Sequence, residues 1–183
     1  MAFRRGYSSA PASASLIASQ FLSKNQPLPS RTQIQVLDAN QLQRLSATLS
    51  RPELASSPPQ NGTPLPPCYH LAYFTPAQVE AELGRDGTDT TFNPPSPYTR
   101  RMWAGGELEW VGGDANRLKV GQQVQETTKL ISAVGKRTKA GEEMVVVGVE
   151  KTYENEIGIA LIDRRFVPME ASLLPKLSMV YRS

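Results

Sequence analysis

The residues of this sequence with the strongest acid–base or nucleophilic chemistry are one cysteine and one histidine, and they lie close together. Cys68 and His70 are separated by a single tyrosine. Cysteine reacts as a thiolate, which a neighbouring cation stabilises, whereas Cys68 follows two prolines and has no cation beside it. We therefore expect Cys68 to be inert. His70 has two interpretations, a general base or a half-buried histidine hydrogen-bonded to the backbone.

The same two residue counts limit metal and disulfide chemistry. A structural zinc site usually takes four Cys or His ligands, and an internal disulfide takes two cysteines. With one residue of each type, the sequence supplies neither. We expect no metal ion and no cofactor.

A pair of arginines provides binding chemistry further along the chain. Arg100 and Arg101 carry planar guanidinium groups, which match the geometry of phosphate oxygens. As exposed arginines they can instead stay solvated or pair with Glu107 or Glu109. The sequence leaves both interpretations open.

An aromatic residue and two glycines follow the arginines. Trp103 can stack on an adenine or an acyl chain, or it can belong to the core, since it is flanked by apolar residues. Gly105 and Gly106 permit a close backbone approach or a bulge, for the fold or for a ligand. The predicted substrate-binding residues are therefore Arg100, Arg101, Trp103, Gly105 and Gly106.

An antiparallel sheet is expected to position this block, because the C-terminal part of the chain alternates between apolar and polar residues. Runs near 106–111, 122–134, 143–153 and 157–163 are separated by turn residues, and no proline occurs from 98 through 167. Each strand is expected to turn back on the previous one. A short helix followed by four or five antiparallel strands makes the fold class α+β.

Two short helices are expected before the sheet. Asp38 can cap the first, in which leucines recur on one face. The second is predicted over 76–83, with Thr75 as its cap. Residues 55–67 are expected to be a proline-rich linker, and 68–74 an extended or strand-like segment.

The first thirty residues have the composition of a targeting sequence. Residues 1–30 are rich in serine and alanine and contain Arg4, Arg5 and Lys24 but no acidic residue. This is typical of a mitochondrial transit peptide, and the stretch 5–9 is similar to the surroundings of a matrix cleavage site. A disordered basic leader is the alternative. We expect a location in the mitochondrial matrix.

Basic residues are concentrated near the N-terminus. Residues 1–51 carry six basic residues and one acidic residue, whereas 52–183 carry fourteen basic and sixteen acidic residues. The body is therefore slightly acidic, and no nucleic-acid partner is expected, because nucleic-acid binding needs a basic face. No run of apolar residues is long enough to span a bilayer, so no membrane partner is expected either.

The stretch from Tyr69 to about Arg165 carries a family resemblance. Its most specific block is PYTRRMWAGGELEW at 97–110, which is followed by LKVG at 118–121. These residues resemble the N-terminal half of the hydroxyacyl-thioester dehydratase type 2 and mesaconyl-CoA hydratase family, one of the MaoC-like hot-dog families. The resemblance implies a single hot-dog half, in which a curled antiparallel sheet surrounds a short helix.

The resemblance also implies an activity. Family members add or remove water across the Cα–Cβ bond of an acyl thioester, using an Asp and a His that the resemblance places in a second hot-dog repeat. We therefore expect no catalytic residue in this chain. Arg100 and Arg101 would contact phosphates of CoA or of the phosphopantetheine arm. The implied partners are an acyl-CoA or acyl-carrier-protein thioester, and a second hot-dog half or a homodimer partner.

The expected function is therefore the substrate-positioning half of a mitochondrial 3-hydroxyacyl-thioester dehydratase or enoyl-thioester hydratase. The alternative is a non-catalytic module that binds an acyl thioester or another subunit. The chain divides into four predicted parts: a leader at 1–30, a short helix and proline-rich linker at 31–67, the hot-dog domain at 68–166 and a divergent tail at 167–183. Pro168 is expected to disfavour a regular continuation of the last strand.

Overall fold

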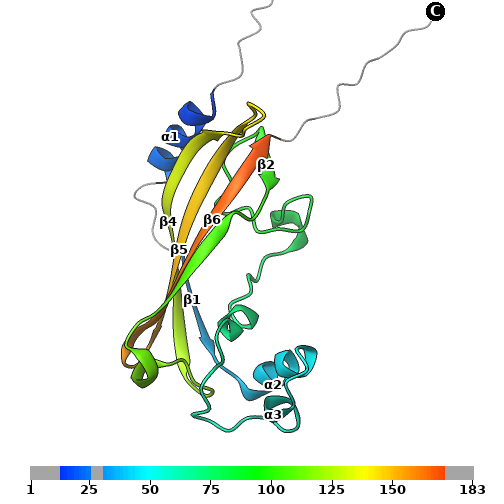
Figure 1. The fold of residues 1–183 in the computed structure, drawn as a ribbon, viewed down its shortest axis with the longest axis vertical. Helices are drawn as coiled ribbons and strands as arrows, with labels where there is room; N and C mark the ends of the chain where they lie inside the picture. The colour runs from blue at the N-terminus through cyan, green and yellow to red at the C-terminus, as the bar shows by residue number, and fades with distance from the viewer. Residues whose placement is uncertain (1–12, 26–30, 172–183) are drawn as a thin grey trace, which may run out of the picture.

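One antiparallel sheet organises the computed structural model, which describes residues 13–25 and 31–171 (Figure 1). Its strands are β1 (Arg31–Val36), β2 (Tyr98–Arg101), β3 (Gly105–Trp110), β4 (Gln123–Arg137), β5 (Glu143–Asn155) and β6 (Gly158–Ala171). The strand order is β1–β4–β5–β6–β2, and β3 also pairs with β6. Every pairing is antiparallel. The expectation of a curled antiparallel sheet is confirmed.

Strands β4, β5 and β6 are long and follow one another in the chain, connected by two tight turns. β4 and β5 meet at 138–142, where the Thr138 N–H donates to the Glu142 carbonyl at 2.9 Å. β5 and β6 meet at Asn155, whose side-chain oxygen accepts from the Ile157 N–H at 2.9 Å. Both turns lie where the sequence predicted them.

Strand β6 continues beyond its predicted end. It runs through Pro168 to Ala171, although proline has no N–H for a strand ladder. The carbonyl of Pro168 accepts from the Met102 N–H at 2.9 Å, so this part of β6 faces the connection between β2 and β3. Because that connection is not itself a strand, the missing N–H interrupts no regular ladder. Residues 167–171 therefore belong to the sheet, and 172–183 lie outside the described residues.

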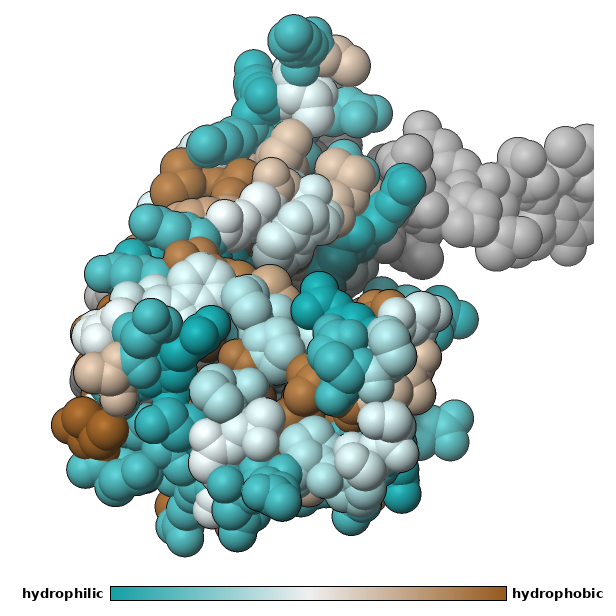
Figure 2. All heavy atoms as spheres, turned by 60° about the horizontal axis from the view of Figure 1, so that its bottom comes forward, coloured by the Kyte–Doolittle hydropathy of each residue, from teal (hydrophilic) through white to brown (hydrophobic). Residues whose placement is uncertain are grey.

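Helices occupy short segments. They are α1 (Ala14–Lys24), α2 (Ala39–Thr48), α3 (Pro52–Ala55) and the 3₁₀ turns η1 (Tyr69–Ala72), η2 (Glu80–Glu82) and η3 (Gly113–Asn116). α2 confirms the helix predicted after Asp38, whose carboxylate accepts from the Gln41 N–H at 3.0 Å. Leu42 is fully buried on its inner face. The end of the molecule that carries α2 and α3 is covered mainly by hydrophilic side chains (Figure 2).

Two predictions for the segment before β2 are wrong. The helix predicted over 76–83 is reduced to the single 3₁₀ turn η2, and Val79, which was to mark its apolar face, is 64% exposed. A two-turn helix is unstable unless its apolar face is buried. The apolar face expected at Val79 is not buried here. The strand-like segment predicted over 68–74 contains η1 instead, which places Tyr69 and His70 in buried positions.

The proline-rich stretch 55–67 is hydrogen-bonded to the segment 118–120, which precedes β4. The Leu65 N–H donates to the Leu118 carbonyl at 2.8 Å, and the Gly62 N–H donates to the Val120 carbonyl at 2.8 Å. Leu65 is also buried in the core. The stretch expected to be a linker is therefore an ordered strap beside η1.

Helix α1 lies within the predicted leader but packs on β4 and β5 (Figure 1). Its buried residues are Ala14, Ile17, Ala18 and Phe21. The Ala14 N–H donates to a Glu143 carboxylate oxygen at 3.0 Å. Gly135 permits the close approach, since a Cβ there would lie 2.4 Å from the Ser15 nitrogen. Residues 14–24 therefore belong to the folded domain, whereas the candidate cleavage stretch 5–9 lies outside the described residues.

Two apolar clusters pack on the same face of the sheet, one toward each end. One combines α1 with Val145 and Met169, and the other combines η1 and α2 with Tyr153 and Leu161. Val145 and Tyr153 are an even number of residues apart on β5, so both point to this face. The stretch of sheet between the clusters is the floor of a cavity.

Candidate functional site

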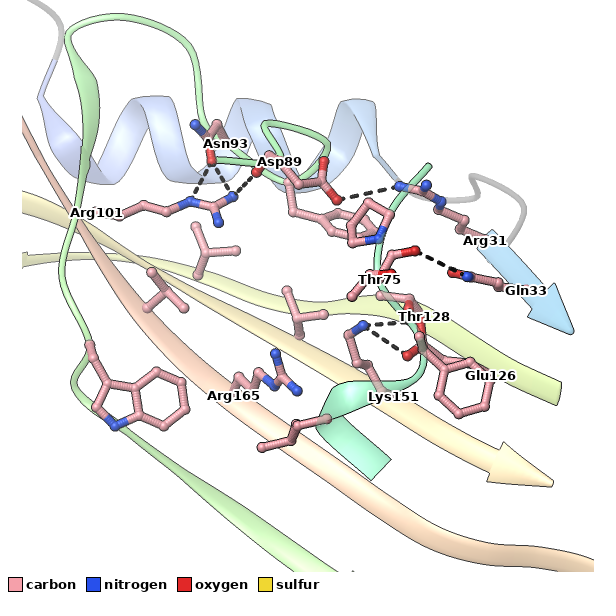
Figure 3. A pocket seen from close by; sticks show the side chains of 18 of the residues that line it. Arg31, Gln33, Thr75, Asp89, Asn93, Arg101, Glu126, Thr128, Lys151 and Arg165 are labelled. Atoms are coloured by element: carbon pink, nitrogen blue, oxygen red, sulfur yellow. Dashed lines mark hydrogen bonds and ion pairs between the residues drawn. The ribbon is translucent and has the colours of Figure 1, made fainter. Parts of the chain in front are cut away.

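The cavity between the two clusters has a volume of about 650 Å³. Its floor is formed by β4, β5 and β6, and its walls by β1, η1 and the segments 74–76, 89–93 and 101–103. In Figure 3 the floor side chains point up from the strands, and Asn93 and Asp89 lie opposite them on the wall. A cavity of this size accommodates a small-molecule ligand.

One end of the floor is apolar. Val147 and Val149 on β5 lie beside Val167 and Met169 on β6, and Phe92 lines the opposite wall. Aliphatic and aromatic side chains of this kind favour an apolar ligand, because burying its surface releases water.

The other end of the floor carries a buried ion pair between neighbouring strands (Figure 3). Lys151 Nζ lies 3.0 Å from both carboxylate oxygens of Glu126. The Thr128 hydroxyl also donates to Glu126 at 3.0 Å. The side chains of Lys151 and Glu126 are only 19% and 6% exposed, so each depends on the other for compensation of its charge.

A second charged cluster lies beside the first, at the base of η1. The carboxylate of Asp163 accepts from Arg165 Nε at 2.9 Å and Nη2 at 2.5 Å. His70 Nε2 lies 3.8 Å from the same Asp163 oxygen, which is within ion-pair range but too far for a hydrogen bond. The ring of Tyr153 packs edge-on against His70 with centroids 5.0 Å apart. The carboxylate beside His70 was not anticipated by either interpretation drawn from the sequence.

The environment of this cluster changes two pKa values. Burial would raise the pKa of Asp163, but the adjacent His70 imidazole and the Arg165 guanidinium, which donates to the carboxylate, outweigh that effect and lower it. Burial, together with the nearby carboxylates of Glu126 and Asp163, raises the pKa of Tyr153, so its hydroxyl stays protonated. At neutral pH, Asp163 is therefore a carboxylate and Tyr153 a neutral phenol.

The lowered pKa of Asp163 predicts a pH dependence of stability. An unfolded aspartate has a pKa of about 3.9. Because the folded-state pKa is lower, the carboxylate stabilises the fold above that value, and the contribution is lost as pH falls through the folded-state pKa. Asp163→Asn is expected to lower the unfolding free energy at neutral pH and to flatten its decline below about pH 4. Urea unfolding across this pH range measures both effects, with exposed Asp114→Asn as the control. If the unfolding free energy of Asp163→Asn declines below pH 4 as steeply as that of the unaltered protein, the pKa of Asp163 is not lowered by folding.

Two arginines lie on the wall at the far side of the cavity (Figure 3). Arg101 donates to the Asn93 side-chain oxygen at 3.1 and 2.7 Å, and also to the Asp89 carbonyl. Arg31 lies 3.3 Å from the Asp89 carboxylate. Arg31 is thus paired with the Asp89 carboxylate, whereas the Arg101 guanidinium is held by the neutral oxygens of the Asn93 side chain and the Asp89 backbone and brings a positive charge to this rim.

The structure places the two predicted arginines differently. Arg101 lines the cavity, whereas Arg100 does not and its side chain is 69% exposed. The acidic residues proposed as alternative partners, Glu107 and Glu109, instead pair with Arg164 at 3.5 and 3.2 Å.

Trp103 and the two glycines also differ in position. Trp103 lines the cavity and is 67% exposed, so it is not a core residue. Gly106 is beside it, outside the lining, and a Cβ there would lie 2.7 Å from the Arg164 carbonyl and 3.2 Å from the Trp103 ring. Gly105, also outside the lining, has a φ of +153°, which side-chain-bearing residues rarely adopt. The glycines therefore shape the start of β3, next to the connection that carries Trp103.

Five charged or titratable residues at the polar end were not predicted as site residues. They are His70, Glu126, Lys151, Asp163 and Arg165. The sequence does contain a signal for Lys151 on β5. This residue continues the alternation of the inward-facing valines before it. A charged residue in phase with a buried apolar face indicates a polar cavity or a buried pair.

Residues 13–25 and 31–171 contain neither a metal-binding cluster nor a membrane-spanning helix. No group of three or more His, Cys, Asp or Glu side chains in these ranges is arranged to hold a metal ion. None of the helices in the same ranges is long and apolar enough to cross a membrane. Cys68 is a free, exposed thiol.

The curled antiparallel sheet with its cavity has the fold of the hot-dog proteins. Residues 68–176 match the family model for hydroxyacyl-thioester dehydratase type 2, which is more than half of the chain. The chain belongs to the hydroxyacyl-thioester dehydratase type 2 family. The resemblance carried by the RRMWAGG block is thereby confirmed.

Individual relatives agree with this assignment. Mesaconyl-C(4)-CoA hydratase of Chloroflexus aurantiacus is 31% identical over 114 residues, which cover 61% of this chain and 38% of that protein. A chain of the ChsH1–ChsH2 complex from Mycobacterium tuberculosis matches with a TM-score of 0.59 and 13% identity, covering 87% of this chain and 94% of that one. A MaoC-like dehydratase from Phytophthora capsici matches with a TM-score of 0.55 and 12% identity, covering 84% of this chain and 53% of that one. At these identities the two structures share the fold.

Proposed function

We propose that this chain is the substrate-positioning part of an enzyme that adds water to an enoyl thioester or removes it from a hydroxyacyl thioester. The observation that carries the proposal is the cavity of about 650 Å³, which combines an apolar floor with a cationic rim. An acyl thioester has matching parts, since it joins an aliphatic chain to a phosphate-bearing carrier. Family membership supports the same class of substrate.

The carrier end of the substrate is proposed to lie at the rim. Arg101 is held by Asn93 and the Asp89 carbonyl, which fixes its guanidinium group at the cavity edge. These contacts use Nε and Nη2, so Nη1 is the guanidinium nitrogen placed to donate a charge-assisted hydrogen bond to a phosphate oxygen. CoA and the phosphopantetheine arm of acyl carrier protein both supply phosphate, so this contact serves either carrier.

This assignment predicts different effects for the two adjacent arginines. Arg101→Ala is expected to weaken binding of butyryl-CoA by about tenfold, because a charged hydrogen bond is lost. Arg100→Ala is expected to change it by less than about twofold, since exposed charges contribute little. Isothermal titration calorimetry of the full chain measures both.

A phosphate-free ligand separates binding from structure. S-butyryl-pantetheine lacks the phosphates, so Arg101→Ala should leave its affinity unchanged. If the variant weakens both ligands equally, Arg101 only holds the wall segment together and the phosphate assignment fails.

The proton-transfer groups are proposed to come from a second hot-dog unit. Mesaconyl-C(4)-CoA hydratase is a longer protein, of which the matched residues cover 38%. β1 supports such an arrangement, because it is an edge strand of the sheet and its Ile34 and Val36 are 57% and 56% exposed. An unprotected edge strand is a natural site for pairing with another chain or domain.

A non-catalytic interaction module is the second candidate. It is favoured by the apolar residues exposed on β4 and β6, where Ile131, Val134 and Phe166 are 38%, 49% and 37% exposed. A binding module would hold a thioester or a subunit without contributing to turnover. Reconstitution with the subunit that supplies the acid–base pair distinguishes the two candidate functions. Hydration of the thioester should then appear only if this chain is part of the enzyme.

We also propose that the protein resides in the mitochondrial matrix, on the composition of residues 1–30. Because α1 is packed on the sheet, cleavage is expected before Ala14. N-terminal sequencing of the protein isolated from mitochondria should give a start between residues 6 and 13. A start after Lys24, or absence from mitochondria, would contradict this.

A further inference from the structure

The face of the sheet turned away from the cavity carries a band of apolar side chains. On β5 the odd-numbered residues 147, 149, 151 and 153 line the cavity, so the even-numbered residues point to the opposite side, which we call the outer face. The β4 and β6 residues that pair with them point the same way. The apolar band consists of Val146 and of Ile131, Val134 and Phe166, which are 38%, 49% and 37% exposed. Apolar side chains gathered on a surface in this way mark a contact with another molecule.

The band is continuous across three strands because Gly148 has no side chain. A Cβ at this position would lie 3.2 Å from the Ile131 side chain and 3.4 Å from the ring of Phe166, so these side chains approach each other over β5. A surface of this shape allows a second sheet to pack face to face, at a distance of about 10 Å and with its strands within about 30° of these.

Charged residues border the band at both of its edges, and their signs are reversed between the two borders. At the edge nearer the β4–β5 turn, Glu170 on β6 lies 3.8 Å from Arg100 on β2. At the other edge, Arg164 on β6 lies 3.5 Å from Glu107 on β3. All four side chains share the outer face, since the two β6 residues pair with even-numbered residues of β5 and with these residues of β2 and β3. One border therefore has its acidic residue on β6, and the other has its basic residue there.

We propose that a second copy of this chain packs on the outer face, related to the first by a two-fold axis that lies across the strands in the middle of the apolar band. This axis lays each border on the opposite border of the other copy. Arg164 then faces the partner's Glu170, and Glu107 faces the partner's Arg100. The interface thus has an apolar centre and a border of complementary charges, and the same surface of both copies forms it.

The charges select this axis over one that runs along the strands. An axis along the strands would lay each border on itself, so that Arg164 would meet the partner's Arg164 or, with the axis on β5, the partner's Lys129. The axis across the strands brings together one pair of like charges, Lys129 and the partner's Lys136. Both are exposed, so their ammonium groups can remain in water.

This surface is separate from the other contacts proposed for the chain. The outer face is turned away from the cavity, so the inference goes beyond the proposed function and does not rest on it. It is also distinct from the edge of β1, which is proposed to receive a second hot-dog unit. A second copy and a second hot-dog unit therefore use different surfaces.

Sedimentation equilibrium of the full chain tests the proposal. The unaltered chain is expected to be a dimer at micromolar concentration. Val134→Lys places a charge in the apolar band and should raise the dissociation constant of the dimer by about tenfold or more, because the ammonium group loses water on association. Ile34→Lys is the control, since it introduces the same charge at a similarly exposed residue of β1 outside the band and should leave the dissociation constant unchanged.

A mixing experiment tests the predicted pair of residues across the interface. Glu107→Arg and Arg100→Glu should each weaken the dimer by about tenfold, because like charges then face each other. In an equal mixture the introduced arginine of one copy faces the introduced glutamate of the other, so a dimer should form again. Mixing does not repair a change within one chain, and both side chains are exposed, by 63% and 69%. Circular dichroism verifies that each variant is folded.

The outcomes separate this inference from the proposed function. A monomeric unaltered chain, an unchanged dissociation constant in Val134→Lys, or a mixture that associates no more tightly than its components overturns the second copy as the occupant of the outer face. Butyryl-CoA binding, measured on the same samples, decides the proposed function, because none of these substitutions lies in the cavity lining. A dimer that is lost in Val134→Lys, kept in Ile34→Lys and restored by mixing supports the inference.

Discussion

Replacing Lys151 by alanine is expected to lower the free energy of unfolding by about 3–5 kcal/mol, because it leaves the Glu126 carboxylate buried without a cation. Glu126 is 5% exposed and accepts both hydrogen bonds of Lys151 at 3.0 Å. Arg117→Ala is the matched control, since its ion pair with Asp114 lies at the surface and should contribute less than about 1 kcal/mol. Chemical denaturation of each variant measures the difference.

A double variant tests the mechanism of that loss. In Glu126→Gln/Lys151→Met neither side chain is charged, so most of the stability lost in Lys151→Ala should return. If the double variant is as unstable as the single one, the loss comes from packing around Lys151 and not from an uncompensated charge. A single variant with nearly unchanged stability would show that Glu126 is accessible to solvent.

Phe21→Ala is expected to destabilise the protein by about 3–5 kcal/mol, which is the usual effect of removing a large buried aromatic side chain. Phe21 is 7% exposed and packs with Val145, Val147 and Met169 in the cluster beneath α1. Leu16→Ala on the same helix is the control, because Leu16 is 50% exposed and should have a small effect. Thermal and urea unfolding of both variants measure the contrast.

This comparison decides whether α1 belongs to the mature fold. If Phe21→Ala and Leu16→Ala have equally small effects, α1 is a removable leader and the sheet face beneath it needs another cover. A large effect of Phe21→Ala alone establishes α1 as part of the domain. Cleavage of any targeting sequence must then occur before Ala14.

The strands were predictable because their signal is local. Alternation in β4 and β5, together with turn residues at 138–142 and near Asn155, places each strand against the next one in the chain. The continuation of β6 through Pro168 was not, because it depends on which strand lies opposite that residue. A proline is tolerated where the neighbouring segment forms no regular ladder of hydrogen bonds with the strand. The sequence alone does not identify such a place.

The helices were predictable only where a cap and a buried face coincide. α2 has both the Asp38 cap and the buried Leu42. The segment 76–83 has a suitable cap residue but no apolar face that reaches the sheet, since Val79 is 64% exposed. Burial depends on the tertiary structure, so the cap and stop residues alone led to the prediction of a longer helix than the one that forms.

The candidate site was predictable in part. Arg101 and Trp103 belong to a distinctive block of sequence and do line the cavity. The polar end was missed because its members come from η1, β4, β5 and β6, and the strand register brings them together. Glu126 and Asp163, for example, are far apart in the sequence. They come close together because β5 lies between their strands, with Tyr153 opposite Glu126 and Lys151 opposite Asp163.

The most direct test of the central claim is proton nuclear magnetic resonance of crotonyl-CoA mixed with the purified full chain, in which binding and hydration are observed in one sample. Saturation transferred from the protein to the acyl protons reports binding, and new signals of 3-hydroxybutyryl-CoA report hydration. We expect transfer to the acyl protons without hydration above the rate in buffer. Hydration by the chain alone would place the acid–base pair inside this chain, and absence of transfer would remove the thioester from the cavity.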